Sequence, residues 1–487
     1  MKKDTTFKAL KASGYIDRSI NEELKENLIS KIRAKEPVFP GLWGYEDTVI
    51  PQLKKAILSG HHINLLGLRG QAKTKIARNM IHLLDEYMPI VKGSEINDSP
   101  FQPISKFAKN LLEEKGEDTP ISWIHRSDRF FEKLATPDVN VADLIGDIDP
   151  IKAATLKLPY SDERVLHYGM IPRANRCIFV INELPDLQAR IQVALFNILQ
   201  EGDVQIRGFQ LRMPLDIQFV FTANPEDYTN RGSIVTPLKD RIGSQIFTHY
   251  PKDIELAKKI TAQEANIGAP DQANITISEI ARDLLEQVSF VARHSPYVDA
   301  KSGVSARLSI SAMENLMSSA HLRLIETDSE HTQIRLTDFM SIIPSITGKI
   351  ELVYEGEQEG AAEVAQLLID EAVKTMFDNI FPSIPKLEKK GAVTPYSDII
   401  TWFNENSFLE IESASTEAVY EKNLNSILPL QKLIDKYCSN ATSGEHFFYM
   451  EIVLWALALN NKLDRTETDT AFKFETNQLN QFFYGNN

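Results

Sequence analysis

Short apolar runs alternate with amphipathic stretches between residues 49 and 250. The runs at residues 63–66, 178–181 and 217–222 have the length and composition of buried strands, whereas the stretches between them have helical spacing. Strands that alternate with helices in this way form a parallel sheet covered by helices. We therefore predict an α/β fold for this part of the chain.

The rest of the chain is predicted to be mostly helical. Helical spacing with many charges runs to about residue 35 and is interrupted by the prolines and glycine of residues 37–41. Helical spacing returns after residue 250, and a linker at 382–395 precedes a last helical region. We expect four segments: an N-terminal helical segment (1–35), an α/β core (36–250), a helical lid (251–349) and a mostly helical C-terminal region (350–487).

Insertions are expected inside the core. The interval between Lys73 and Glu183 is longer than one strand–helix unit requires. Two stretches interrupt the alternation, a polar one at 92–122 and one at 147–172 that contains three prolines. We expect both to be additions to the basic sheet-and-helix layout.

The composition of the chain argues against several classes of protein. The 487 residues are 43% hydrophobic, enough for several cores, and the net charge of −14 argues against a surface that binds duplex DNA through its phosphates. The two cysteines, Cys177 and Cys438, are far apart in the sequence, so a disulfide framework and a cysteine zinc site are not expected. Cys177 is interpreted as a small buried hydrophobic residue.

A membrane protein is not expected either. The N-terminus lacks the apolar segment of a secretory signal, so we expect a cytoplasmic protein. The most apolar stretch, residues 447–459, is shorter than the roughly 20 residues of a spanning helix and contains Glu451. We expect it to be a buried core helix.

A candidate phosphate-binding loop follows the first strand. A turn of this kind points backbone N–H groups at phosphates, while Lys73 would reach the β- and γ-phosphates and Thr74 would bind Mg²⁺. Ala72 stands where the second glycine of the usual pattern belongs. The candidate nucleotide-binding residues of this loop are Gly67, Gly70, Gln71, Ala72, Lys73 and Thr74.

The strand that ends at residue 183 has the form of a Walker B strand. In such a motif, an apolar strand ends in two polar side chains that lie beside the γ-phosphate. Glu183 would be the catalytic base, and Asn182 would lie at the metal position, where an aspartate is usual. The amide keeps an oxygen acceptor but loses the negative charge, so we expect weaker retention of Mg²⁺.

Three more residues are candidates for the reaction. Asn224 follows the third strand, where its amide could orient the attacking water, although an Asn before Pro is also a common turn residue. Arg241 could stabilise phosphoryl charge in the site of a neighbouring subunit or simply pair with Asp240. Arg307, at the start of a lid helix, could reach the γ-phosphate or be a surface charge.

Taken in order, these motifs resemble the AAA+ ATPases of the MoxR and magnesium-chelatase subunit I group. The resemblance spans roughly residues 30–345 and implies a P-loop NTPase core with a helical lid. Residues 135–147 resemble the second strand of that group as it leads into a helix-2 insertion, which would account for 147–172. Residues 202–213 resemble its hairpin before the sensor strand.

The resemblance also implies roles for individual residues. Asn224 would be sensor 1, Arg241 the finger that acts in trans, and Arg307 sensor 2. Backbone near Gly44 and Tyr45 would border the adenine. ATP and Mg²⁺ are the implied cofactors.

The function implied by the resemblance is that of an ATP-driven ring motor. Members of this group commonly form hexamers and often act on a partner with a von Willebrand factor A domain, by remodelling the partner or by driving metal insertion. Two alternatives remain open: a nucleotide-binding scaffold that hydrolyses little ATP, and a nucleic-acid-acting AAA+ regulator. The retained Glu183 and Asn224 argue against the scaffold, and the acidic balance argues against the regulator.

Overall fold

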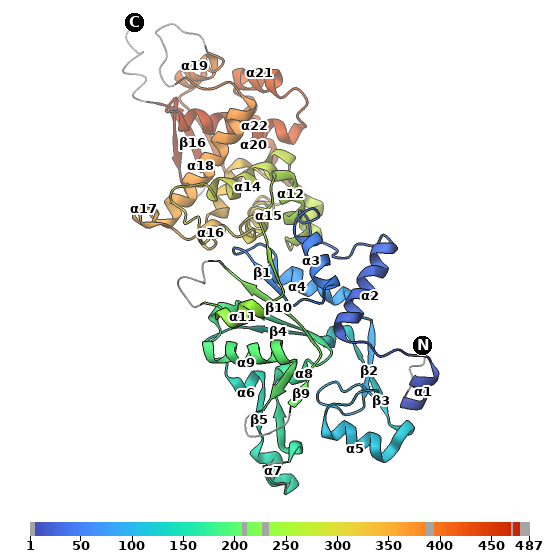
Figure 1. The fold of residues 1–487 in the computed structure, drawn as a ribbon. Coiled ribbons are helices and arrows are strands. Elements are labelled where there is room, and N and C mark those ends of the chain that lie inside the picture. The colour runs from blue at the N-terminus through green and yellow to red at the C-terminus, as the bar shows by residue number, and fades with distance from the viewer. Residues whose placement is uncertain are drawn as a thin grey trace. The chain divides into compact units, whose positions relative to one another are not determined.

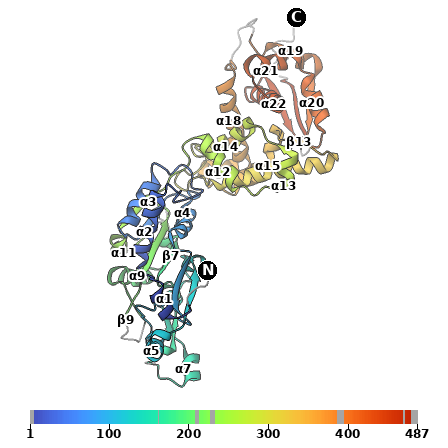
Figure 2. The same cartoon turned by 90° about the vertical axis from the view of Figure 1, so that its right-hand side faces the viewer.

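The computed structural model divides the chain into two compact units, one up to His249 and one from Tyr250 onward (Figures 1 and 2). It describes residues 5–160, 162–206, 212–225, 233–385, 394–468 and 471–477. The first unit contains the main parallel sheet, and the second is mostly helical. The α/β fold predicted for the first half is confirmed.

A five-stranded parallel sheet forms the centre of the first unit, in the order β11-β1-β10-β7-β4. Its strands are β1 (Ile63–Leu66), β4 (Phe130–Leu134), β7 (Cys177–Asn182), β10 (Ile217–Ala223) and β11 (Ser244–Phe247). Every residue of β1, β7 and β10 is buried, as the continuous apolar runs predict. The second strand, expected within residues 135–147, is instead β4, which ends at Leu134, and β11 is not predicted; polar residues interrupt the apolar pattern of both short strands.

Helices cover both faces of this sheet. Alternate residues of β7 separate the two layers, since Ile178 and Val180 belong to one hydrophobic cluster and Phe179 and Ile181 to the other. The first layer contains α2 (Ile20–Arg33), α3 (Val49–Leu58) and α4 (Lys73–Asn79). The second contains α6 (Val141–Leu144), α8 (Met170–Arg173), α9 (Ala189–Glu201) and α11 (Thr236–Arg241) (Figure 1).

Helix α2 is attached by buried polar contacts to residues that directly precede strands of the sheet. Glu23 of α2 forms an ion pair with Arg129 at 2.6 Å, and both side chains are almost fully buried. The Asp216 carboxylate accepts a hydrogen bond from the Ile20 N–H at 2.6 Å. Burial raises the pKa of Asp216 to about 6. The segment 1–35 is therefore packed into the first unit in its described part, which includes α1 (Phe7–Ala12) and α2.

Three antiparallel strand pairs extend from the core. They are β2 (Tyr87–Val91) with β3 (Ile121–His125), β5 (Gly146–Ile148) with β6 (Leu166–Tyr168), and β8 (Asp203–Gln205) with β9 (Arg212–Pro214). Helix α5 (Lys106–Lys115) lies within the first predicted insertion and α7 (Pro150–Leu156) within the second. The predicted hairpin at 202–213 corresponds to β8 and β9, and its residues 207–211 lie outside the described residues.

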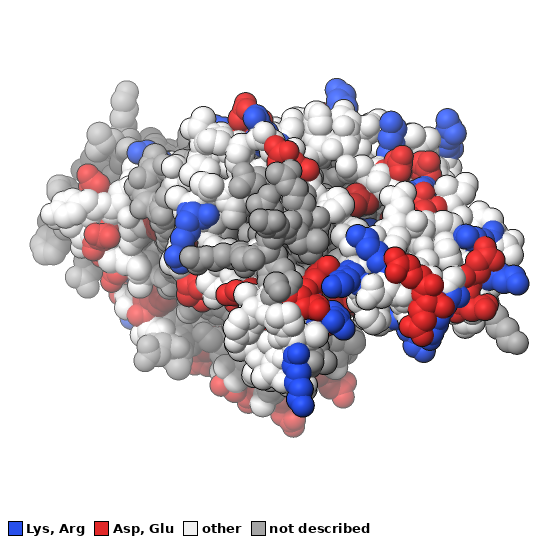
Figure 3. Space-filling view, turned by 60° about the horizontal axis from the view of Figure 1, so that its bottom comes forward, with Lys and Arg blue, Asp and Glu red and all other residues white. Residues whose placement is uncertain are grey.

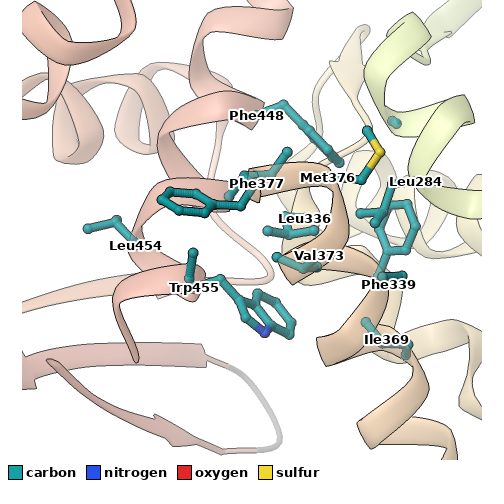
Figure 4. Packing of buried hydrophobic residues seen from close by; sticks show 14 of the residues in the cluster. Leu284, Leu336, Phe339, Ile369, Val373, Met376, Phe377, Phe448, Leu454 and Trp455 are labelled. Carbon is teal, nitrogen blue, oxygen red and sulfur yellow. The ribbon is translucent and has the colours of Figure 1, made fainter. Parts of the chain in front are cut away.

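The second unit is built around one continuous hydrophobic cluster. Its helices are α12 (Ile254–Glu264), α13 (Ala269–Asn274), α14 (Glu279–Ala292), α15 (Arg307–Thr327), a 3₁₀ helix (Leu336–Ile342), α16 (Ile343–Thr347), α17 (Tyr354–Glu359), α18 (Ala361–Ile380), α19 (Ser397–Asn406), α20 (Glu417–Asn425), α21 (Leu428–Tyr437) and α22 (Ser443–Leu459). Figure 4 shows Val373 and Phe377 of α18 among side chains of α22 and the 3₁₀ helix. Residues of the predicted lid and of the predicted C-terminal region thus share a core.

A three-stranded antiparallel sheet, in a region whose pattern predicts mostly helices, completes this unit. Its order is β14 (Phe408–Glu412), β16 (Ala471–Thr476) and β15 (Leu463–Glu467). A short parallel pair, β12 (Ile275–Thr276) with β13 (Thr332–Gln333), lies elsewhere in the unit. Helix α22 contains the predicted apolar core stretch, which is largely buried. Among the described residues, none of the helices has the length and apolar content to cross a membrane.

Candidate functional site

The predicted site segments begin side by side at the carboxyl edge of the parallel sheet. In the register of the strands, Leu66 pairs with Ala223, and Phe221 pairs with Ile181. The Gly67 N–H donates a hydrogen bond to the Ala223 carbonyl at 3.2 Å. The loop after β1 and the segments after β7 and β10 therefore start from three adjacent strands, which is where open α/β sheets bind ligands.

The loop after β1 keeps the backbone of a phosphate-binding turn despite its alanine. Gly70 has φ of 72°, and Ala72 has φ of 54° and ψ of 18°, which is the left-handed region. Glycine enters that region without steric cost, whereas alanine is strained in it. Ala72 thus takes the conformation expected of the glycine that it replaces, and α4 begins at the next residue.

The side chains of Gln71 and Thr248 stabilise the loop through hydrogen bonds. The Gln71 Oε1 accepts hydrogen bonds from the Leu68 N–H and from the Thr248 hydroxyl, each at 2.9 Å. A Cβ on Gly67 would lie only 1.9 Å from the Thr248 Oγ1, so this position requires glycine. Since these contacts bury the side chain of Gln71, the backbone is the part of Gln71 that could face a nucleotide. No motif in the sequence indicates Thr248.

Lys73 lies over the same loop. Its Nζ donates hydrogen bonds to the Gly67 carbonyl and, at 2.9 Å, to the Leu68 carbonyl. Thr74, the second residue of α4, is half-buried. The ammonium group is therefore next to the turn whose N–H groups are predicted to bind phosphate.

Tyr45 contacts the end of the loop from the segment before α3. Its hydroxyl lies 2.9 Å from the carbonyl oxygens of both Gln71 and His249, and its ring packs edge-to-face on His249. Gly44, directly before it, has φ of 81°. The predicted role of Gly44 and Tyr45 beside the adenine stays a prediction, and the structure adds that Tyr45 connects this segment to the loop.

At the end of β7, Asn182 is held between two neighbours. Its Nδ2 donates to the Glu132 Oε1 at 2.6 Å, and its Oδ1 accepts from the Thr222 hydroxyl at 3.1 Å. The amide is buried. Glu132 lies on β4, before the residues at which the second strand is expected, so this partner of Asn182 is not among the predicted site residues.

Glu183 has an exposed side chain and a strained backbone. Its φ of 57° and ψ of 49° lie in the left-handed region, and its N–H donates to the Thr222 hydroxyl at 3.1 Å. Such backbone conformations cost of order 1–3 kcal/mol for residues other than glycine and concentrate at functional sites. Thr222 therefore contacts both residues of the predicted pair, and the Glu183 carboxylate is accessible.

The other three candidates occupy different surroundings. Asn224 is buried directly after β10, beside the loop. Arg241, at the end of α11, forms an ion pair with Asp240, the alternative that the sequence leaves open. Exposed pairs of this kind contribute about 0–1 kcal/mol, so the pairing does not prevent a second role. Arg307 is the exposed first residue of α15 and belongs to the second unit.

The residues of this edge fit a magnesium nucleotide. The oxygen donors near the strand ends are hydroxyls, an amide and carboxylates, which suit a hard cation such as Mg²⁺. The left-handed turn at Ala72 keeps the loop geometry that presents backbone N–H groups, and Lys73 adds a positive charge there. Cys177, by contrast, is fully buried, and burial raises the pKa of its thiol to about 12.

This fold and this edge define the class of protein. A parallel sheet in the order β11-β1-β10-β7-β4, with a glycine-containing loop between β1 and α4 and polar residues after β7 and β10, is the core of a P-loop NTPase of the AAA+ type.

Comparison with known proteins narrows that class. No protein-family profile matches the chain. The magnesium-chelatase 38 kDa subunit of Cereibacter sphaeroides is 26% identical over 210 residues, which cover 41% of this chain and 55% of that subunit. The subunit of the same name from Rhodobacter capsulatus is 25% identical over 243 residues, covering 49% of this chain and 63% of the relative. The matched region is thus less than two thirds of either relative.

Solved structures give weaker matches. The complex of subunits BchI and BchD of magnesium chelatase aligns with 66% of this chain and 99% of that chain, at 18% identity and a TM-score of 0.35. NtrX from Brucella abortus aligns with 63% of this chain and 56% of that chain, at 14% identity and a TM-score of 0.33. Both TM-scores are below 0.5. The sequence relatives therefore support the assignment to the AAA+ ATPases of the MoxR and magnesium-chelatase subunit I group, at modest identity.

Proposed function

We propose that this chain is an ATP-hydrolysing AAA+ motor that works as a ring and remodels or activates a partner protein. The observation that carries the proposal is the meeting of three polar segments at one sheet edge, where the Gly67 N–H bonds to the Ala223 carbonyl beside Asn224. The Ala72 turn, with its left-handed backbone, supports nucleotide binding at this edge. Glu183, exposed after the adjacent strand, supports hydrolysis rather than binding alone.

Each residue has a distinct role in the proposed reaction. Lys73 leaves its loop carbonyls to pair with the β- and γ-phosphates, and the Thr74 hydroxyl provides an oxygen ligand. Glu183 accepts the proton of the attacking water, and Asn224 orients that water. Mg²⁺, bound together with ATP, neutralises charge on the phosphate oxygens.

The ring completes the site in this proposal. Arg241 has a side chain that is 40% exposed, so it can reach a neighbouring subunit by breaking its weak pair with Asp240. Arg307 would contact the γ-phosphate as the sensor 2 residue of the group. We propose a hexamer, as is common in the resembling group, with a von Willebrand factor A domain protein as partner. Because the relatives are named magnesium-chelatase subunits, metal insertion is one activity that such a ring could drive.

A nucleic-acid substrate is not favoured. In the face drawn in Figure 3, Lys and Arg side chains are interspersed with Asp and Glu among the described residues. Ion pairs such as Lys152–Glu95 at 3.1 Å and Arg164–Asp162 at 2.7 Å neutralise individual basic groups. Phosphate-backbone binding needs clustered positive charge, and the net charge of −14 opposes it.

Steady-state ATPase rate against protein concentration tests the proposal. The rate per subunit should rise with concentration and disappear in Glu183→Gln, which should still bind ATP. Lys73→Ala should lose nucleotide affinity instead. If Glu183→Gln hydrolysed ATP like the parent, the assignment of the base would be wrong. Tight ATP binding with no turnover at any concentration, with or without cell extract as a source of partner, would favour a scaffold.

A further inference from the structure

The strand that should hold a metal-binding acid has no carboxylate at its buried end. Asn182 stands at that position, and its two amide atoms are both engaged by neighbours. An amide oxygen that accepts the Thr222 hydroxyl at 3.1 Å attracts a cation less than a carboxylate does. A site that binds a magnesium nucleotide therefore needs its negative charge from another residue.

Glu132 provides a carboxylate within hydrogen-bond distance of that amide. It lies on β4, the strand next to β7, and pairs in register with Val180, so Asn182 is its diagonal neighbour on the same face of the sheet. The Glu132 Oε1 accepts the Asn182 Nδ2 at 2.6 Å. The Glu132 side chain is 24% exposed, so it is close to the buried end of β7 and still reachable by water.

Helix α4 faces the same carboxylate. The Arg78 Nε donates to the Glu132 Oε2 at 2.8 Å. Arg78 is one helical turn after Thr74, so the two residues lie on the same face of α4. Since Thr74 is the proposed hydroxyl ligand, the face of α4 that bears it is turned toward β4 and Glu132.

We infer that Glu132 is the acidic residue that positions Mg²⁺ in this chain, replacing the charge that Asn182 lacks. The inference deepens the proposed function and rests on it. Asn182 acts as a tether that orients the carboxylate, and Glu132 accepts hydrogen bonds from the water shell of the metal. Mg²⁺ keeps several waters and binds to proteins through one or two carboxylates, which fits one acid at the edge of the site.

The ion pair with Arg78 alone is a weaker explanation for Glu132. The Arg78 side chain is 64% exposed, and pairs with so exposed a partner contribute about 0–1 kcal/mol. The contact with Asn182 is shorter and more buried. It is the contact that ties the carboxylate to the end of β7, the strand that leads into Glu183.

The test measures how nucleotide binding depends on Mg²⁺. The full chain is titrated with a fluorescent ADP analogue at a series of Mg²⁺ concentrations, which reports binding without turnover. Glu132→Gln keeps an oxygen that can accept from Asn182 but removes the charge. We expect it to raise the Mg²⁺ concentration for half-maximal binding by about 10- to 100-fold, as loss of an outer-sphere metal partner does.

Two further variants separate this role from a structural one. The double variant Glu132→Gln with Asn182→Asp exchanges the amide and the carboxylate of this hydrogen-bonded pair, so that the acid is at residue 182. It should restore the Mg²⁺ dependence of the parent. Arg78→Ala, the control, removes the other partner of Glu132 and should leave that dependence nearly unchanged. Thermal melts of all variants, without nucleotide, show whether each one folds.

The outcomes are distinct. A parent-like Mg²⁺ dependence in folded Glu132→Gln would overturn the role of Glu132 while leaving the proposed ATPase intact. An equal shift in Arg78→Ala would assign the effect to the ion pair and would also overturn it. Binding of the analogue by the parent that did not depend on Mg²⁺ would overturn the inference alone, whereas no binding at any Mg²⁺ concentration would overturn the proposed function as well.

Discussion

At the scale of single residues, the site keeps its geometry where its composition departs from the usual pattern. Ala72 adopts the backbone of a glycine, and Glu183 is held in the left-handed region by its position between β7 and a short 3₁₀ helix. Both residues therefore have a strained backbone, and the packing of the surrounding fold offsets the energetic cost of that strain. Strain of this kind is a local quantity that single substitutions can measure.

Ala72→Gly should increase the stability of the first unit by up to about 1 kcal/mol, because relief of the left-handed alanine exceeds the entropy that glycine adds to the unfolded chain. Chemical denaturation measures the change. Ala154→Gly is the matched control, since Ala154 is exposed within α7 and has no such strain. That substitution should lower stability by about 1 kcal/mol. Destabilisation by Ala72→Gly would contradict the strained turn.

At the scale of elements, α2 and the residues just before it belong to the first unit because buried charges connect them. Glu23 on α2 pairs with Arg129, which also donates to the Arg176 carbonyl. Arg176 in turn pairs with Asp17 at 2.8 Å. Buried charges without partners are costly, so the segment before residue 35 and the sheet depend on each other.

Glu23→Ala should lower the stability of the first unit by about 3–5 kcal/mol, since it leaves the Arg129 guanidinium buried without its carboxylate. Replacing both residues, Glu23→Leu with Arg129→Leu, should restore part of the loss. Urea unfolding followed by circular dichroism measures both. For comparison, Lys11→Ala removes the exposed pair with Glu117 and should cost less than about 1 kcal/mol. Similar losses for Glu23→Ala and Lys11→Ala would show that burial does not matter here.

At the scale of the whole molecule, the two units carry separate cores and separate buried acids. Glu451 of α22 is fully buried, and burial raises its pKa to about 7 against the opposing hydrogen bonds from the Leu336 N–H and the Tyr420 hydroxyl. A carboxyl group whose pKa is higher in the folded protein than in the unfolded chain stabilises the folded state when it is protonated. Its contribution is complete below the unfolded pKa and is lost as the pH rises through about 7.

The second unit should therefore become more stable as the pH falls from 8 to 5, by up to about 3 kcal/mol from this group. Glu451→Gln should remove most of that dependence, because an amide does not titrate. Urea unfolding at several pH values, followed by tryptophan fluorescence in a background with Trp43→Phe and Trp123→Phe, tests the prediction in the second unit, where Trp402 and Trp455 lie. A pH dependence that persists unchanged in Glu451→Gln would assign it to other groups.

The proposed ring makes a further prediction at this scale. Arg241→Ala should abolish ATP hydrolysis by the assembled ring while leaving nucleotide binding nearly intact, because the finger acts on a neighbouring subunit. Mixing Arg241→Ala with Lys73→Ala subunits should restore some activity. At some interfaces, a subunit with an intact Lys73 then lies next to a subunit with an intact Arg241. ATPase assays on the mixtures measure this. No recovery across mixing ratios would argue against action in trans.

The sequence by itself determined the local parts of this protein. The apolar runs of β1, β7 and β10 identify a buried parallel sheet, and the Gly67–Thr74 segment identifies the loop, because both depend on residues that are close in the chain. The roles of the site residues remain predictions. The meeting of the segments after β1, β7 and β10 at one sheet edge follows from the strand order, which local patterns do not contain.

Only the tertiary structure decided which distant residues meet. Glu132 reaches Asn182 because β4 pairs with β7, and Thr248 supports Gln71 because β11 pairs with β1. The short edge strands have too little apolar pattern to be predicted, since pairing with the sheet stabilises them more than their own composition does. The shared core of the second unit depends in the same way on helices far apart in sequence. These contacts are non-local, so no window of the sequence specifies them.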